Sequence, residues 1–364
     1  MSETARPFRV REDLRDITPY GAPQLDVPVR LNTNETATPP PEIFAAELAK
    51  QLADLPLNRY PDRQHMLLRE ALAARVGRDA HELWAANGSN EILLQLLQAY
   101  GGPKRTLMYP HPSYSMYPEL CRTTLTNAVS FPLDSNYRLS VEAAKAAVAT
   151  HNPDLILVPS PNNPVGTLCT QDAIVALHDS SQALVIVDEA YIEFAAPEAS
   201  VLPLVGQLDR LVIVRTFSKA FRLAGLRLGY LIAPTYVVDD LQTVRLPYHL
   251  DQIKQVAART ALAHEEAFLT HRQEIALERD RITGVLSERG DVTVYDSAAN
   301  FFLLRSTVPD MFTRLLDHGV LIRDFSTVAG LDGCVRVTIG TPEENDRFLE
   351  AVTAVLDAHG KGRS

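Results

Sequence analysis

The sequence has few of the residues that build disulfide frameworks or cysteine-ligated metal sites. Its 364 residues include three cysteines, Cys121, Cys169 and Cys334, which are widely separated and form no C-x-x-C pair. An odd number of dispersed cysteines indicates neither a disulfide-stapled fold nor a zinc site. We therefore expect a protein of a reducing compartment, with the cytoplasm as its predicted location.

Long apolar runs and an excess of basic charge are also missing. No stretch approaches the ~20 apolar residues that a membrane helix needs, and residues 1–10 carry charges where a signal peptide would be apolar. The net charge is −10 at pH 7, whereas a nucleic-acid surface requires clustered lysine and arginine. We expect neither a membrane nor a nucleic acid as a partner.

What the sequence does contain is an alternation of apolar strands and helical stretches between Leu83 and Ala233. This alternation predicts an α/β fold with a doubly wound, mostly parallel sheet. No G-x-G-x-x-G run opens the first strand-to-helix turn, which disfavours a dinucleotide-binding dehydrogenase. We expect an N-terminal arm over residues 1–36, a large domain over 37–249 and a smaller α+β domain over 250–364.

One lysine stands among hydroxyl groups in the run RTFSKAFRLAGLRLGY, directly after an apolar strand. The strand would deliver Thr216, Ser218 and Lys219 to the sheet edge at which open α/β sheets bind ligands. Arg227 follows on the same segment. A primary amine, two hydroxyls and a cation suggest a phosphorylated aldehyde as ligand, because a neutral lysine forms a Schiff base with an aldehyde. Taken alone, the Ser218-Lys219 pair is better explained by a surface lysine in a strand-to-helix loop.

The same run is similar to the lysine segment of the fold-type I pyridoxal-phosphate-dependent aminotransferases, and it most resembles their histidinol-phosphate aminotransferase branch. The resemblance rests here on Ser218 and Lys219 with Arg227 after them, and it extends over nearly the whole chain. It implies pyridoxal 5'-phosphate as the cofactor and Lys219 as its attachment point and as the catalytic base and acid. It also assigns Thr216, Ser218 and Arg227 to the cofactor phosphate.

Two further segments are candidates for the cofactor phosphate. The run NGSN lies between a predicted strand and a helix, and such a helix start offers free N–H groups to an anion. Ser89 or Asn90 could instead simply cap the helix, while the resemblance assigns both to the phosphate. Without the resemblance, Tyr60 in the loop RYPD would be interpreted as a partly buried packing residue. The resemblance places it at the phosphate of a neighbouring subunit, which implies a homodimer with shared active sites.

Four residues are candidates for holding the cofactor ring. Asp188 ends an all-apolar strand, where a carboxylate requires a cationic partner. The resemblance makes that partner a protonated pyridine nitrogen; a metal ion or a helix start is the alternative, although no His or Cys stands nearby. Asn163 and Tyr191 are then expected at the phenolate oxygen, and Tyr114 is expected to stack on the ring. Otherwise Asn163 satisfies its own turn and Tyr114 is a core residue.

Candidates for the substrate pocket are Tyr20, Tyr248, Arg323 and Arg336. A solvated strand face explains Arg336 in the run CVRVT, but the run RVTIG resembles the family segment whose arginine binds a carboxylate or phosphate. We expect Arg323 to serve the phosphate of histidinol phosphate, and Arg336 to serve both that phosphate and the carboxylate of glutamate. The run LNTNETATPPP matches only the first half of the family's L-N-x-N-E-N-P opening, and it predicts no role.

The resemblance implies transfer of the amino group of L-histidinol phosphate to 2-oxoglutarate in histidine biosynthesis, giving imidazole-acetol phosphate and L-glutamate. An aromatic amino-acid aminotransferase and a phosphothreonine-type decarboxylase share every one of these motifs, because cofactor residues do not encode the side-chain pocket. An aminotransferase-like ligand sensor would carry a fused DNA-binding domain or lack the lysine, and the sequence fits neither description.

Overall fold

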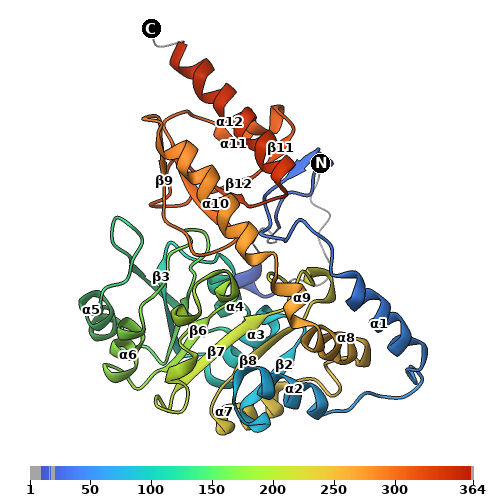
Figure 1. Ribbon diagram of the computed structural model, residues 1–364. Helices are drawn as coiled ribbons and strands as arrows, with labels where there is room; N and C mark the ends of the chain where they lie inside the picture. The colour runs from blue at the N-terminus through green and yellow to red at the C-terminus, as the bar shows by residue number, and fades with distance from the viewer. Residues whose placement is uncertain (1–9, 16, 18–20, 362–364) are drawn as a thin grey trace.

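Seven strands form the central sheet in the computed structural model of the protein, which describes residues 10–15, 17 and 21–361 (Figure 1). In sheet order they are β2 (Leu83–Ala86), β8 (Gly229–Ile232), β7 (Leu211–Thr216), β6 (Leu184–Asp188), β5 (Leu155–Pro159), β3 (Thr106–His111) and β4 (Asn127–Pro132). Among them only β8 runs antiparallel to its neighbours. The predicted α/β fold with a mostly parallel sheet is confirmed.

Helices cover both faces of this sheet, since successive residues of a strand point to opposite sides. In β7, Leu211 and Ile213 belong to one buried apolar cluster and Val212 and Val214 to the other. The helices on the Val212 side are α3 (Ser89–Tyr100), α4 (Met116–Thr124) and α7 (Thr235–Val244), and those on the other side include α2 (Met66–Val76), α5 (Val141–His151), α6 (Gln171–Asp179) and α8 (Gln252–Ala263). The sheet is therefore doubly wound, as expected.

A second, smaller unit lies at the edge where the parallel strands end, in the upper part of Figure 1. Its antiparallel sheet has the order β12 (Arg323–Asp324), β13 (Cys334–Thr338), β10 (Phe301–Ser306) and β9 (Val292–Val294). The helices that accompany it are α10 (Arg272–Ser287), α11 (Met311–Asp317) and α12 (Pro342–Lys361). The N-terminal segment reaches this unit through β1 (Val29–Arg30), which pairs in parallel with β11 (Val320–Leu321).

The domain boundaries expected at residues 37 and 250 stay predictions. Directly after the second of them, α8 packs against α1 (Glu42–Ala53) and α2, which belong with the large sheet. After the short helix α9 (Glu265–Leu269), α10 packs on β9 of the small sheet. The packing therefore favours a boundary between α8 and α10. In the described part of the chain, no helix has the length and apolar character needed to cross a membrane.

Candidate functional site

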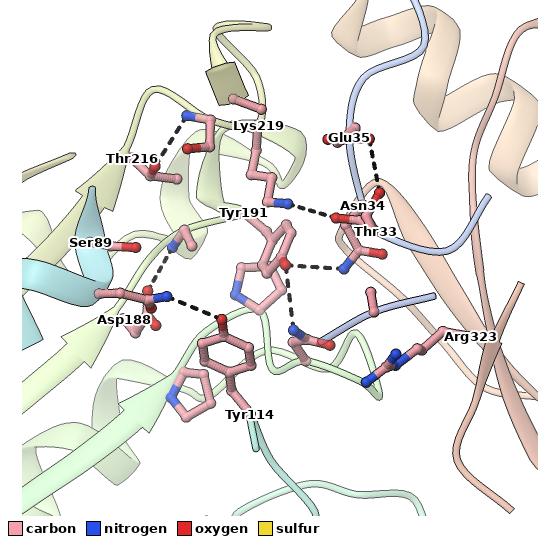
Figure 2. A pocket seen from close by; sticks show the side chains of 18 of the residues that line it. Thr33, Asn34, Glu35, Ser89, Tyr114, Asp188, Tyr191, Thr216, Lys219 and Arg323 are labelled. Carbon is pink, nitrogen blue, oxygen red and sulfur yellow. Dashed lines mark hydrogen bonds between the residues drawn. The ribbon is translucent and has the colours of Figure 1, made fainter. Parts of the chain in front are cut away.

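The carboxyl ends of the parallel strands open into a cavity of about 400 Å³ beneath the small unit. Figure 2 shows it from close by, with side chains from the large sheet, the N-terminal segment and the small unit converging on it. Most of the predicted site residues line this cavity: Ser89, Asn90, Tyr114, Asn163, Asp188, Tyr191, Thr216, Ser218, Lys219, Arg227, Arg323 and Arg336. The fold thus brings together groups that are widely separated in sequence.

Two predicted residues lie elsewhere in the described part of the chain, and a third falls outside that part. Tyr20 lies outside the described residues. Tyr60 and Tyr248 are not among the residues that line the cavity. Their rings stack on each other, with centroids 4.4 Å apart and an interplanar angle of 15°. Their side chains are 79% and 40% exposed. The roles expected for these two tyrosines stay predictions.

Lys219 follows β7 and points into the cavity, where its Nζ donates a hydrogen bond to the carbonyl oxygen of Thr33 at 3.0 Å (Figure 2). Burial, followed by the nearby cation of Arg336, lowers the pKa of this amine to about 7. Arg227 acts in the same direction on the pKa, and the Glu35 carboxylate opposes them. Much of the amine is therefore neutral near pH 7, as attack on an aldehyde requires.

Hydroxyl groups, amides and a guanidinium meet where the loop after β7 approaches the start of α3. Arg227 donates a hydrogen bond to Ser218 Oγ at 3.2 Å. Gly88 has a φ of 92°, and a Cβ atom added to it would lie 2.9 Å from the Arg227 guanidinium. Glycine therefore keeps this space open beside Ser89 and Asn90. Free N–H groups at a helix start, together with an arginine, suit a phosphate group.

Thr216 also faces this region, but its hydroxyl is engaged within the chain. It donates to the carbonyl oxygen of Leu228 at 3.2 Å and accepts a hydrogen bond from the Ser218 N–H at 3.1 Å. A hydroxyl oxygen has a second lone pair, so Thr216 retains one place for a donor. The described contacts show it shaping the loop that carries Lys219.

Asp188 is buried at the end of β6, in the floor of the cavity. Its carboxylate accepts hydrogen bonds from the Tyr117 hydroxyl at 3.0 Å and from the Ala190 N–H at 3.2 Å. Burial raises the pKa of this carboxyl to about 6, although both hydrogen bonds act in the opposite direction. A cation at this position would offset the cost of burying the charge. Among the described residues no cluster of His, Cys, Asp and Glu is arranged to hold a metal ion.

Two aromatic rings line the cavity next to this carboxylate. Tyr114 packs edge-on against Tyr117, with ring centroids 5.5 Å apart at 88°, and its hydroxyl accepts a hydrogen bond from Asn90 Nδ2 at 3.4 Å. The sequence does not predict Tyr117, which is fully buried. The available signal is its spacing from Tyr114, since residues three apart at a helix start share a face.

The two arginines of the small unit are neighbours, because Arg323 on β12 is paired with Arg336 on β13. Arg336 is only 6% exposed, so the alternative of a solvated strand face does not apply to it. Its guanidinium donates to Asn163 Oδ1 and, at 2.6 Å, to the carbonyl oxygen of Asn32. Arg323 donates to the Gly21 carbonyl oxygen at 3.3 Å. Two adjacent guanidinium groups favour an anionic ligand at this end of the cavity.

The N-terminal segment forms a wall for which the sequence predicts no role. The carbonyl oxygens of Asn32 and Thr33 accept hydrogen bonds from Arg336 and Lys219. Asn34 Nδ2 donates to the Tyr191 hydroxyl oxygen at 3.0 Å, as Figure 2 shows. Contacts made through main-chain oxygens leave no signal in a sequence, which explains why this wall is not predicted.

Comparisons with known proteins agree with this arrangement. Residues 27–352 match the family model described as aminotransferase class I and II. The chain is 44% identical over 361 residues to the histidinol-phosphate aminotransferase of Corynebacterium diphtheriae, with 97% of this chain and 98% of that protein covered. The family resemblance expected from the sequence is confirmed.

Solved structures also share this fold. The histidinol-phosphate aminotransferase of Sinorhizobium meliloti, in complex with pyridoxal-5'-phosphate, matches with a TM-score of 0.88 at 24% identity, covering 98% of this chain and 100% of that one. The L-threonine-O-3-phosphate decarboxylase of Porphyromonas gingivalis matches with a TM-score of 0.79 at 26% identity, covering 90% and 99% of the two chains. Proteins with different reactions therefore share this architecture.

Proposed function

Because this chain is a transaminase that belongs to the class I and II aminotransferases, we propose that it transfers the amino group of L-histidinol phosphate to 2-oxoglutarate. The products are imidazole-acetol phosphate and L-glutamate, as in histidine biosynthesis. The observation that favours a phosphorylated substrate over an aromatic amino acid is the pairing of Arg323 with Arg336 at one end of the cavity. This pair of cations suits a substrate with a phosphate and a co-substrate with carboxylates.

Pyridoxal 5'-phosphate is the proposed cofactor, and the donor and acceptor groups of the cavity fit it. The residues that would hold the phosphate are Ser89, Asn90, Thr216, Ser218 and Arg227. Asp188 would pair with the ring nitrogen, Asn163 and Tyr191 would bond to the ring oxygen, and Tyr114 would stack on the ring. When bound, this cofactor supplies an electron sink for charge that develops at the substrate carbon.

Lys219 has two roles in the proposed reaction. Its Nζ would form the bond to the cofactor's aldehyde carbon, for which the neutral amine is needed. Once released, the same Nζ would take a proton from the substrate carbon and return it on the cofactor side. The lowered pKa of Lys219, about 7, supports both steps, because an amine with a pKa near the working pH exchanges protons readily.

A homodimer with shared active sites is also part of the proposal. The stacked pair of Tyr60 and Tyr248 supports it, since both rings are partly or largely exposed and lie away from the cavity of their own chain. In a dimer, Tyr60 would reach the cofactor phosphate of the partner, and Tyr248 would approach the partner's substrate. The cytoplasmic location remains a prediction.

A substrate panel tests the proposed function against its two alternatives. The purified protein, supplied with pyridoxal phosphate, should turn over histidinol phosphate with 2-oxoglutarate at a higher kcat/KM than phenylalanine and should produce glutamate. Faster turnover of phenylalanine would indicate an aromatic aminotransferase. Release of carbon dioxide from phosphothreonine without a need for 2-oxoglutarate would indicate a decarboxylase, whose substrate phosphate the two arginines would suit equally well.

A further inference from the structure

Asn34 is buried where the two units of the protein meet, and the proposed function assigns it no part. Its side chain is 1% exposed and its backbone adopts a φ of 54°. The Asn34 N–H donates to Thr338 Oγ1 at 3.1 Å, and the Thr338 hydroxyl donates to Asn34 Oδ1 at 3.0 Å. Asn300 Nδ2 donates to the Asn34 carbonyl oxygen at 3.2 Å. The small unit therefore holds Asn34 by three hydrogen bonds.

These contacts determine which way the Asn34 amide faces. The Thr338 hydroxyl accepts from the Asn34 N–H and donates its single proton to Asn34 Oδ1. The Nδ2 group is thereby turned toward Tyr191 and donates to its hydroxyl oxygen at 3.0 Å. Asn163 Nδ2 also donates to this oxygen, at 3.5 Å.

A donor on the hydroxyl oxygen changes what Tyr191 can do. When Asn34 donates to this oxygen, the tyrosine's own proton points elsewhere, and hydrogen bonds in a chain strengthen one another. The packing of the ring limits the directions open to it, because Tyr191 lies edge-on to Phe301 with centroids 5.0 Å apart at 84°. The hydroxyl lines the cavity and faces the space proposed for the cofactor ring.

We propose that Asn34 is a positioning residue, which acts through Tyr191 by keeping the tyrosine proton directed at the ring oxygen of the cofactor. This inference rests on the proposed function and adds a residue to it. Thr338, which orients the Asn34 amide, lies on β13 together with Arg336. The strand that carries a proposed substrate arginine therefore also directs the hydrogen bond from Asn34 Nδ2 to the Tyr191 hydroxyl.

The substitution Asn34→Asp tests the idea, because it preserves the shape of the side chain and replaces the Nδ2 donor with an acceptor. The carboxylate would accept a hydrogen bond from the Tyr191 hydroxyl, which would then no longer donate to the cofactor oxygen. We expect the midpoint of the pH titration of the bound cofactor's absorbance to rise by about one pH unit, as for the loss of one hydrogen bond. Asn34→Ala, which is neutral, should shift it in the same direction.

A double-mutant comparison separates this role from a merely structural one. In a Tyr191→Phe background, Asn34→Ala should leave the midpoint of that background unchanged, and Asn34→Asp should raise it by less than it does when the Tyr191 hydroxyl is present, because only the effect of its charge remains. Equal shifts with and without the Tyr191 hydroxyl would mean that charge or packing causes the effect, and they would overturn the proposal. Unchanged midpoints in the single Asn34 variants would overturn it as well.

Thr338→Val gives a test in which Asn34 itself is intact. It removes the hydroxyl that orients the amide, so a smaller upward shift of the same midpoint is expected, again absent in the Tyr191→Phe background. No shift in Thr338→Val would contradict the argument for the amide's orientation. If the wild-type protein showed no cofactor absorbance at all, the proposed function would fail together with this inference. If the wild-type protein titrated normally and the Asn34 variants had the same midpoint, only the inference would fail.

Discussion

The protonation of Lys219 offers a quantitative test of the site. Its pKa is lowered from 10.5 to about 7, first by burial and then by Arg336. At pH 7.5 roughly three quarters of such an amine is neutral, compared with about one part in a thousand for an ordinary lysine. Covalent capture of pyridoxal phosphate by the cofactor-free protein should therefore be roughly several hundred-fold faster than capture by a surface lysine of equal access.

Two substitutions should move this pKa in opposite directions. Arg336→Gln removes a cation that lowers the pKa of Lys219, so the midpoint of the capture rate against pH should rise. Glu35→Gln removes a carboxylate that raises the pKa, so the midpoint should fall. Stopped-flow absorbance over the neutral and alkaline range measures the rates, and borohydride reduction with peptide mapping identifies the labelled residue. Pyridoxal, which lacks the phosphate and its titration, is the control reagent.

The reasoning fails if the wild-type midpoint lies near that of a free lysine, if both variants shift in one direction, or if the label is on a lysine other than Lys219.

The pH dependence of stability gives a second test of the pKa of Lys219. The pKa of Lys219 is lower in the folded than in the unfolded protein, so its burial reduces the free energy of unfolding. This loss of stability grows as the pH falls from 10.5 to about 7 and is constant below that. It amounts to at most ~5 kcal/mol. Lys219→Met should therefore stabilise the cofactor-free protein most below pH 7, and it should abolish turnover.

Three further predictions concern the dimer, the substrate and the ring nitrogen. Mixing inactive Lys219→Ala and Tyr60→Ala subunits should restore activity, because one site of the mixed dimer keeps both side chains. If subunit exchange is proven and the activity is still no higher than that of the Tyr60 variant, the active sites are not shared. Arg336→Ala should lower the single-turnover kcat/KM by orders of magnitude with both amino donors, at ~2–5 kcal/mol per lost buried contact. Arg323→Ala should spare glutamate, and equal losses would contradict the assignment of the phosphate. Tyr117→Phe should raise the pH below which cofactor affinity weakens, because the carboxylate in the floor loses a donor that holds its pKa down; an unchanged profile in a fluorescence titration would exclude this role.

Several of the residues that the sequence predicted for the cofactor stand at the ends of parallel strands. Asp188 and Thr216 each close an apolar strand, β6 and β7, and these two strands are adjacent in the sheet. Because the carboxyl ends of parallel strands meet at one edge, hydrophobic patterning alone brings such residues together. The same local reasoning explains why the fold class could be predicted before any long-range contact was known.

Other parts of the site depend on contacts that local patterns do not contain. The Tyr117 hydroxyl on α4 donates to Asp188 at the end of β6, although nothing near either residue in the sequence pairs them. The antiparallel direction of β8 depends on the connection from β7, which contains only the short helical turn Ala224–Leu226, while a parallel neighbour requires a long crossover. The role predicted for Tyr60 belongs to the proposed homodimer, so a single chain does not test it.

The N-terminal segment shows how a partial motif can retain a complete set of contacts. Asn32 and Thr33 bind Arg336 and Lys219 through carbonyl oxygens, which every residue possesses. Thr36 stands where the family opening has its third asparagine, and its hydroxyl still donates to the Lys219 carbonyl oxygen at 2.8 Å. The described contacts of this segment with the site thus tolerate changes at several positions. Asn34 is different, because its short side chain donates through one atom and accepts through another, which a hydroxyl or a carboxylate does not do.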